Sequence, residues 1–480
     1  MTFHRLDIKN VWIQAIRASF FMGQKHTFTF LTFLWISIAG PPFAVGETTP
    51  EILSLEQCIQ RALANSPGLE SAEFEREIAL GKLSEAKRAY ILPEAKVRVL
   101  GGPVPDVPDG SGPEANFPEV DTEFGDLGPF IQIRLDAVQP LFTFGKLSGL
   151  KRAAQFGLDA KEAQERAVRN ELVRRVKKIY FGLVYLYSLK DFLEELQDRS
   201  GKARDRVEDL IKRHNPDVTD IDVMRMDVFQ AETDRRLAEL QGGIQFGEST
   251  LAILVAAPKG TSVTIQDKMV RFHDIALQSI EAYFKKAEVS RPELRQLNDL
   301  LGARKALLKS TRADYFPSFF IGGFYGYGWA PDRQDVHSPF LKDDFNFHSG
   351  GIGLGLEQKL TFHLTDSKHD QAKAEYLKAV ADKKLALQGI EIEIRKAHAD
   401  AMAKRESVKA ALRGFKAGRS WVTATTLNFG VGLVPVKDLL EAFVAYSKVK
   451  VGYFDTIHDY DQALADLSKV IGEEIVALKY

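Results

Sequence analysis

Hydrophobic residues recur every seven positions over three long parts of the chain. The three series are Leu172, Ile179, Leu186 and Leu193; Leu237, Ile244 and Leu251; and Ile457, Leu464, Ile471 and Leu478. A sustained spacing of seven predicts helices that pack as coiled coils. The stretch 144–213 contains no proline, so as one helix it would be roughly 105 Å long at the usual rise per residue.

A period of two residues predicts four β-strands. Two strands follow prolines, over 96–100 and 319–329, and two more are expected around 131–136 and 351–356. In these second strands apolar residues alternate with polar residues or with glycine. The segments between the strands, 103–129 and 330–347, are rich in Pro, Gly and Asp and are predicted to be exposed loops.

Internal repetition indicates that the chain consists of two similar halves. Arg88-Ala89 with Pro93 matches Arg312-Ala313 with Pro317, 224 positions later. Three further matches keep the same order: Ser66–Leu69 with Arg291–Leu294, Gln139–Leu141 with Gln358–Leu360, and Asp222-Val223 with Asp438-Leu439. We therefore expect a duplicated unit of about 220 residues, placed at 47–260 and 261–480.

The N-terminus has the pattern of a secretory signal peptide. Thr27 to Ala39 is an uncharged apolar run preceded by Lys25 and followed by Gly40 and two prolines. The run is too short to span a bilayer as a helix, which takes about 20 apolar residues. Residues 1–46 are predicted to be this signal, with Met22 as a candidate true start, and no later segment reads as a transmembrane helix.

Composition narrows the function further. Net charge is −1, which gives no electrostatic footprint for nucleic acid. The only cysteine, Cys58, cannot form an internal disulfide or a cysteine-rich metal site and lacks a lipid-attachment context. His363, Asp366, His369 and Asp370 have no recognised ligand spacing and are read as solvated surface. We expect no cofactor, no metal site and no enzymatic activity, because no catalytic constellation is present.

In this order, duplicated and behind a signal peptide, these motifs resemble the TolC family of outer-membrane efflux proteins over nearly all of 50–478. The residues that show the resemblance are the opening Leu53–Gln57 with Ala62–Pro67, the strand entries at Pro93 and Pro317, Gln139–Phe142, and Val431–Leu433 before Asp438–Ala442. The resemblance implies a mainly α fold. In it, long antiparallel coiled-coil helices from two repeats are joined to four strands per chain, which enter a trimeric transmembrane β-barrel of 12 strands.

The resemblance also implies partners and a place in the cell. The homotrimer would form the exit duct of a tripartite efflux or type I secretion system, in contact with a periplasmic adaptor (membrane fusion) protein, an inner-membrane transporter and outer-membrane lipid. It would lie in the cell outer membrane, with a tunnel in the periplasm. The residues alone reach part of this picture: four strands cannot close a barrel, and open sheet edges are not tolerated in hydrocarbon, so several chains must contribute strands.

Three sets of residues follow as candidate sites. The aromatic and apolar residues that share one parity in 319–329 are expected to face lipid: Phe319, Ile321, Tyr325, Tyr327 and Trp329. The turns between the long helices are expected to dock the adaptor through Asn215, Pro216, Gly430, Gly432, Leu433 and Pro435. Asp438 and Glu441 lie three apart on one helix face, where the resemblance places the constriction of the periplasmic entrance.

Two departures from the family pattern concern the helix turns and one corner. The turn 214–220 lacks the Gly-Leu pair present at 432–433, so the adaptor surface there is expected to differ, and Val434 occupies the position of the family's basic partner. Gln358-Lys359-Leu360 replaces Gln-Pro-Leu, which leaves the corner 359–364 undefined. An extracytoplasmic coiled-coil scaffold or adhesin without channel activity stays open as the alternative, and the sequence does not identify the exported substrate.

Overall fold

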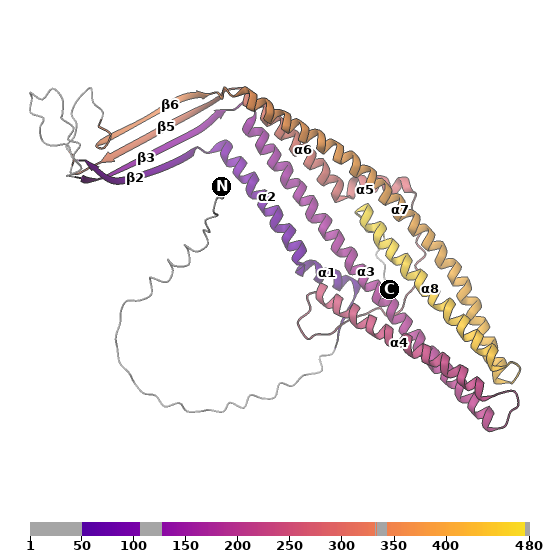
Figure 1. Ribbon diagram of the computed structural model, residues 1–480. Coiled ribbons are helices and arrows are strands. Elements are labelled where there is room, and N and C mark those ends of the chain that lie inside the picture. Colours follow the sequence, from indigo (N-terminus) through magenta and orange to yellow (C-terminus); the bar gives the residue numbers. More distant parts are fainter. Residues whose placement is uncertain (1–49, 106–126, 332, 334–342, 476–480) are drawn as a thin grey trace, which may run out of the picture. The chain divides into compact units, whose positions relative to one another are not determined.

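The computed structural model describes residues 50–105, 127–331, 333 and 343–475 (Figure 1). The first half contains β1 (Glu51–Leu53), α1 (Leu55–Asn65), α2 (Pro67–Ile91), β2 (Glu94–Pro105), β3 (Leu127–Phe142), α3 (Lys146–Lys212) and α4 (Asp220–Leu254). The second half contains β4 (Val263–Ile265), α5 (Ile280–Ser290), α6 (Pro292–Arg312), a 3₁₀ turn η2 (Ala313–Tyr315), β5 (Ser318–Trp329), β6 (Phe347–Glu357), α7 (Phe362–Gly430) and α8 (Val436–Ile471).

Apart from the added 3₁₀ turn, the two halves present the same order of elements. Each runs from a short strand through two helices, two long strands and a very long helix to a final helix. The short strands β1 and β4, which the sequence pattern did not reveal, pair in parallel from Glu51↔Val263 to Leu53↔Ile265. This small sheet joins the start of the first half to the start of the second.

The junctions α1/α2 and α5/α6 explain one pair of repeated motifs. Ser66 caps α2, its hydroxyl accepting a hydrogen bond from the Leu69 amide at 3.3 Å, and Pro67 takes the first helical position. In the second half Arg291 takes the cap position and Pro292 follows it. Proline is tolerated there because its missing N–H would have no partner inside the helix. Each half therefore breaks its helix at the same point.

Four long helices lie side by side in the order α4, α3, α8, α7, with α3 and α7 having 67 and 69 residues. Leu193, Ile244, Leu251, Ile457 and Leu464 from the heptad series are buried between them. Lys450 of α8 lies 4.2 Å from the ring centre of Phe192 on α3 and 2.9 Å from a carboxylate oxygen of Glu195. The heptads thus predicted the helices and most of their buried positions. Ile179, Leu186 and Leu237 are half-buried, and Leu478 lies outside the described residues.

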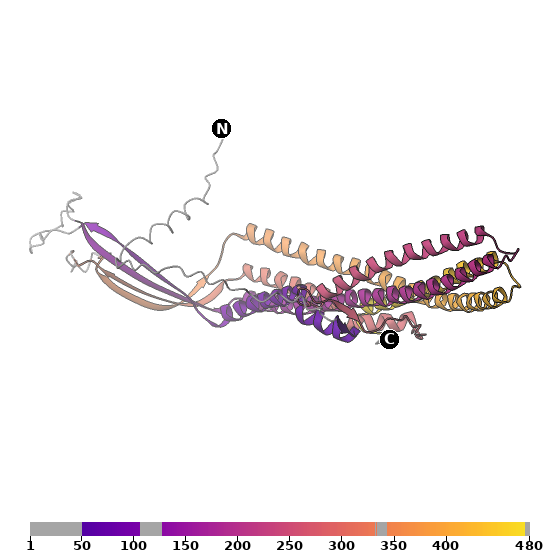
Figure 2. The ribbon, with the colours of Figure 1, turned by 90° about the horizontal axis from the view of Figure 1, so that it is seen from below.

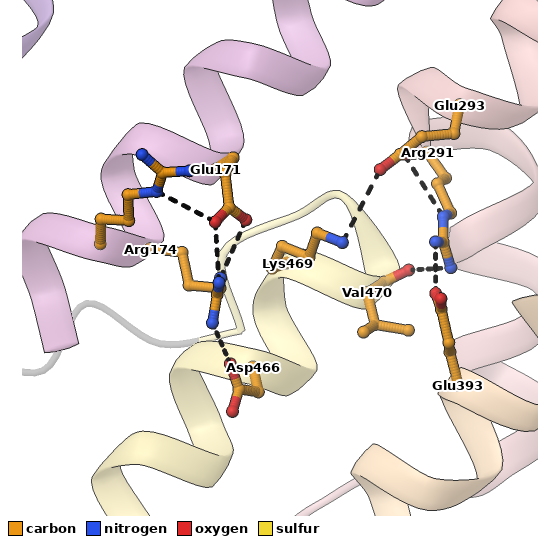
Figure 3. A network of polar contacts seen from close by, with 9 residues as sticks. Glu171, Arg174, Arg291, Glu293, Glu393, Asp466, Lys469 and Val470 are labelled. Carbon is orange, nitrogen blue, oxygen red and sulfur yellow. Dashed lines mark hydrogen bonds and ion pairs between the residues drawn. The ribbon is translucent and has the colours of Figure 1, made fainter.

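Buried charge fastens the end of α8 to its neighbours (Figure 3). The Arg291 guanidinium, 4% exposed, donates to Glu393 of α7 at 2.6 Å and to the Val470 carbonyl of α8 at 3.2 Å. Arg174 of α3 bonds Asp466 of α8 at 2.9 Å. Because a buried guanidinium is costly without partners, this arginine requires α6, α7 and α8 to meet here.

The four long strands form one antiparallel sheet in the order β2-β3-β5-β6, which continues from the ends of the helices (Figure 2). The strands are longer than the sequence predicted. Pro103 and Val104 pair with Pro129 and Gly128, and Phe347 with Gly328, so the predicted loop ends are strand. Within one chain β2 is an edge strand, a position where a proline such as Pro103 is tolerated.

The corners from sheet to long helix differ between the halves. In the first, Phe144 and Gly145 take left-handed backbone angles, φ +48° and +96°, before α3 begins. In the second, α7 begins at Phe362 after Thr361, whose φ is −89°. The corner that the sequence left undefined therefore turns without a left-handed residue. Within the described part of the chain no helix is long and apolar enough to cross a membrane, and the predicted signal 1–46 lies outside that part.

Candidate functional site

One face of the four-stranded sheet is apolar on every strand. The register places Tyr325 opposite Leu135, Tyr327 opposite Ile133 and Trp329 opposite Ile131. The same face continues through Val97 and Val99 on β2 and through Ile352, Leu354 and Leu356 on β6. All of these side chains are exposed, as are Phe319 and Ile321. The five residues predicted on one strand therefore belong to an apolar surface of the whole sheet.

The opposite face combines glycines, phenylalanines and charged residues. Phe320 lies across from Gly355, Phe324 across from Gly351 and Phe347 across from Gly328. A β-carbon on Gly355 would lie 2.3 Å from the Phe320 ring, so only glycine lets this ring lie against the neighbouring strand. Charges on this face are confined to β2, β3 and the end of β6: Glu94, Lys96, Arg98, Arg134, Asp136 and Glu357. The sheet thus separates an apolar face from a mixed polar one.

The second helix turn has the predicted break in the long helix. α7 ends at Gly430, Gly432 takes φ +79°, and the Leu433 amide donates to the Asn428 carbonyl at 2.8 Å. This bond closes the helix end in a Schellman-type turn, which favours glycine at the left-handed position. Leu433 is 73% exposed, and Pro435 occupies the cap position of α8. An apolar side chain therefore projects from a fixed turn.

The first helix turn reaches the same backbone geometry without glycine. His214 takes φ +57°, and the Asn215 amide donates to the Leu210 carbonyl at 3.1 Å, as Leu433 does in the other half. Asn215 accepts a hydrogen bond from the Asp217 amide at 3.0 Å, which fixes the turn that contains Pro216. The two turns differ in side chains and length rather than in how the helix ends, and the expected difference in the adaptor surface stays a prediction.

Asp438 and Glu441 are both exposed on α8, whereas Leu439 and Ala442 are buried. The two carboxylates are therefore both accessible on one helix, and their place at a constriction stays a prediction. The matching residues of the first half, Asp222 and Arg225, behave differently: Asp222 is 8% exposed, accepts from the Thr219 amide at 3.0 Å and bonds Arg225 at 3.0 Å. The repeat spacing of 216, which aligns Asp222 with Asp438, is the sequence signal that identifies this pair.

Other candidate chemistry is accounted for by packing. The Tyr315 hydroxyl donates to Asp366, and Oγ1 of Thr311 lies 3.1 Å from Nδ1 of His369. These contacts hold the start of α7 against the preceding segment. Among the described residues no group of three or more metal-binding side chains comes together. Burial raises the pKa of the Cys58 thiol to about 11, which keeps it protonated and unreactive at neutral pH.

Comparisons with known proteins agree with this geometry. Residues 284–473 match the sequence model of the family described as "Outer membrane efflux protein". No curated protein sequence matches the chain. The fold is similar to that of the outer-membrane channel OprN, with a TM-score of 0.71 at 16% identity over 87% of this chain and 89% of that one.

Two further solved structures have similar folds. The outer membrane protein VceC from Vibrio cholerae matches with a TM-score of 0.69 at 18% identity, covering 88% of this chain and 97% of that chain. The open state of the Neisseria gonorrhoeae MtrE outer membrane channel matches with a TM-score of 0.69 at 18% identity, covering 88% and 89%. At these identities the likeness concerns the fold.

Proposed function

We propose that this chain is a member of the outer membrane efflux protein family, that it lies in the cell outer membrane with its helices in the periplasm, and that it works as a homotrimeric exit duct. In this proposal it serves a tripartite efflux or type I secretion system. Transport through it is passive and is driven by an inner-membrane transporter, reached through a periplasmic adaptor protein. The family whose model matches residues 284–473 is described as one of outer membrane efflux proteins, which supports a transport role rather than an enzymatic one.

The observation that carries the proposal is the apolar face of the sheet. Exposed apolar residues form a continuous surface across all four strands, for example Val97, Leu135, Tyr325 and Leu354. A water-exposed surface of this kind is unfavourable, whereas lipid would cover it at no cost. The opposite face, with its glycines and charges, suits a water-filled lumen.

Open edges of the sheet support assembly from several chains. β2 and β6 each have a neighbour on one side only. Unpaired backbone groups are too costly in hydrocarbon, so β2 of one chain has to pair with β6 of the next. Three copies would close twelve strands (four strands per chain), within the range known for such barrels.

The helices give independent support for an oligomer. Near the turns, the two outer helices expose apolar residues: Ile221, Met224 and Val228 on α4, and Leu427 on α7. Exposed fractions of 59% to 71% at these positions leave an apolar stripe on α4 and an exposed leucine on α7. In a ring of copies, α4 of one chain would cover α7 of its neighbour and bury these residues.

The two turns and the acidic pair take roles within this duct. The exposed Leu433 and the turns around Asn215, Pro216, Gly430, Gly432 and Pro435 lie at the end of the helices away from the sheet, where an adaptor would dock. Asp438 and Glu441 begin the helix that follows the second turn. Repeated by threefold symmetry, they would form a ring of carboxylates at the periplasmic entrance that attracts cations.

Substitution on the two faces of the sheet tests the proposal. Tyr325→Arg should reduce trimer yield and heat stability in outer-membrane fractions, because arginine on the lipid face costs about 2–4 kcal/mol near the midplane. The matched control is Gln132→Arg on the polar face of β3, which should assemble like the parent.

Equal assembly of both variants would contradict the assignment of the faces. Recovery of the unaltered chain as a soluble periplasmic monomer would exclude the duct and leave the coiled-coil scaffold or adhesin as the explanation.

A further inference from the structure

One row of the sheet brings two arginines together on the polar face. The register pairs Arg98 of β2 with Arg134 of β3, Arg134 with Gly326 of β5, and Gly326 with Ser349 of β6. All four residues lie opposite the apolar face, because their neighbours in sequence, such as Val97, Leu135 and Tyr325, form that face. The row contains no acidic residue.

Like charges directly opposite each other destabilise a strand pair, so the pairing of Arg98 with Arg134 needs a compensating group. Arg134 donates only its Nε to a carboxylate, reaching both Asp136 oxygens at 3.1 Å. Arg98 has no ion-pair or hydrogen-bond partner among the described residues. Lys96, one row away, is already paired with Glu94 at 2.9 Å. Among the described residues, the Arg98 guanidinium therefore has no carboxylate partner, and the two terminal nitrogens of the Arg134 guanidinium have none either.

The surroundings leave space for a ligand. A β-carbon on Gly326 would lie 3.0 Å from the Phe347 ring and 3.5 Å from the Ser349 hydroxyl, so the ring and the hydroxyl both lie beside this glycine, and the open side of the row is at Arg98 and Arg134. The Arg134 guanidinium lies 6.0 Å from the ring centre of Phe324, an aromatic surface in the adjacent row. Two guanidinium groups, a hydroxyl and an adjacent ring are the groups that recognise an oxyanion attached to an apolar body.

We propose that Arg98, Arg134 and Ser349 form a binding row for the oxyanion group of a solute in transit, a carboxylate, phosphate or sulfonate. This inference rests on the proposed duct, in which the polar face lines the lumen. The guanidinium forks of Arg98 and Arg134 contact the oxyanion oxygens, and the Phe347 ring beside Gly326 borders the site toward Ser349. Exposure of Arg134, 54% for its side chain, keeps the contact open to water and therefore reversible.

The row also gives the duct two regions of opposite charge. The helix end carries the exposed Asp438 and Glu441, whereas the sheet carries the arginine row. An anionic solute that has passed the acidic entrance would meet a favourable site nearer the exit. Binding there disfavours its return toward the periplasm, since the acidic ring lies behind it.

Conductance of the reconstituted trimer in planar bilayers tests the proposal, with inorganic pyrophosphate as the probe in divalent-free buffer. Pyrophosphate added on the side of the sheet should reduce the conductance of the parent. R98Q/R134Q should raise the half-blocking concentration by about tenfold or more, since charge-assisted hydrogen bonds are lost. The matched control K96Q removes one positive charge from the same face and should change it by less than about twofold, since Lys96 is already paired.

Arg98→Gln alone keeps the test decisive if the double variant does not assemble, because it breaks no contact among the described residues; it should raise the half-blocking concentration several-fold. Absence of block in a conducting parent would overturn the oxyanion row, as would equal effects of K96Q and R98Q. Absence of any conductance from the parent trimer would instead count against the proposed duct.

Discussion

The two helix turns share a backbone and differ in chemistry. Both end their long helix with the same pattern of hydrogen bonds, around His214 in one half and Gly432 in the other. Beyond the turn, Asp222 is buried in contacts with Thr219 and Arg225, whereas its counterpart Asp438 is exposed beside Glu441.

This difference indicates which acidic residue is available for function. In the first half the carboxylate is satisfied by an amide at 3.0 Å and by an arginine, so it stabilises the start of α4. In the second half the arginine position holds Glu441, and Pro435 provides no side-chain cap. The two halves share the turn, and two side-chain differences, Thr219 against Pro435 and Arg225 against Glu441, separate a structural ion pair from an exposed acidic pair.

The largest effect is expected from removing the exposed pair. Asp438→Ala with Glu441→Ala should lower cation selectivity and weaken block by a trivalent cation about tenfold or more, equivalent to about 1.4 kcal/mol of binding free energy. Asp222→Ala with Arg225→Ala removes the matching residues of the first half and should leave block unchanged. Planar-bilayer conductance measures both, and parent-like block in the first variant would remove these residues from the constriction.

The second largest effect is expected on docking of the periplasmic adaptor, which should differ between the two turns. Gly432→Asp places a charge beside the exposed Leu433, and we expect it to abolish cross-linking to the periplasmic adaptor and drug resistance. His214→Asp puts the same side chain at the matching left-handed position of the polar turn and should retain more of both. Intact cross-linking in Gly432→Asp would contradict docking at the second turn.

A smaller effect is expected on stability. Asp222→Ala should lower the thermal midpoint of the trimer by an amount equivalent to about 1 kcal/mol per chain, since it opens the capping box of α4. Asp438→Ala should change stability by less than about 0.5 kcal/mol, as for exposed surface substitutions. Circular dichroism of the detergent-solubilised trimer gives both midpoints, and equal shifts would mean that the two acids are equally structural.

The smallest effects concern the left-handed residues themselves. Gly432→Ala should destabilise the turn by about 1 kcal/mol, because a β-carbon is disfavoured at φ +79°. His214→Gly relieves that strain but gives the unfolded chain more freedom, so we expect a net change within about 0.5 kcal/mol. The same melting experiment compares them, and a neutral Gly432→Ala would show that the second turn adjusts its backbone.

The sequence by itself determined the repeated plan, because periodicity is a local property. The seven-residue spacing of Ile457 and Leu464 predicted a packed helix. The two-residue spacing of Tyr325 and Tyr327 predicted a strand with an apolar face, and Gly432 predicted a turn. Each of these signals lies within one element. Because the two halves repeat at a nearly constant spacing, a prediction made for one half also applied to the other.

Only the tertiary structure decided which residues meet across elements. Nothing in the spacing of Arg98 and Arg134 places them in one row with Ser349, because register depends on how β2, β3, β5 and β6 align, and a shift of one residue would reverse the faces. Likewise, Asp222 and Asp438 follow their turns at matching positions, yet one is buried and one exposed. Burial depends on the side chains that surround a carboxylate in space, and these come from contacts that sequence periodicity does not encode.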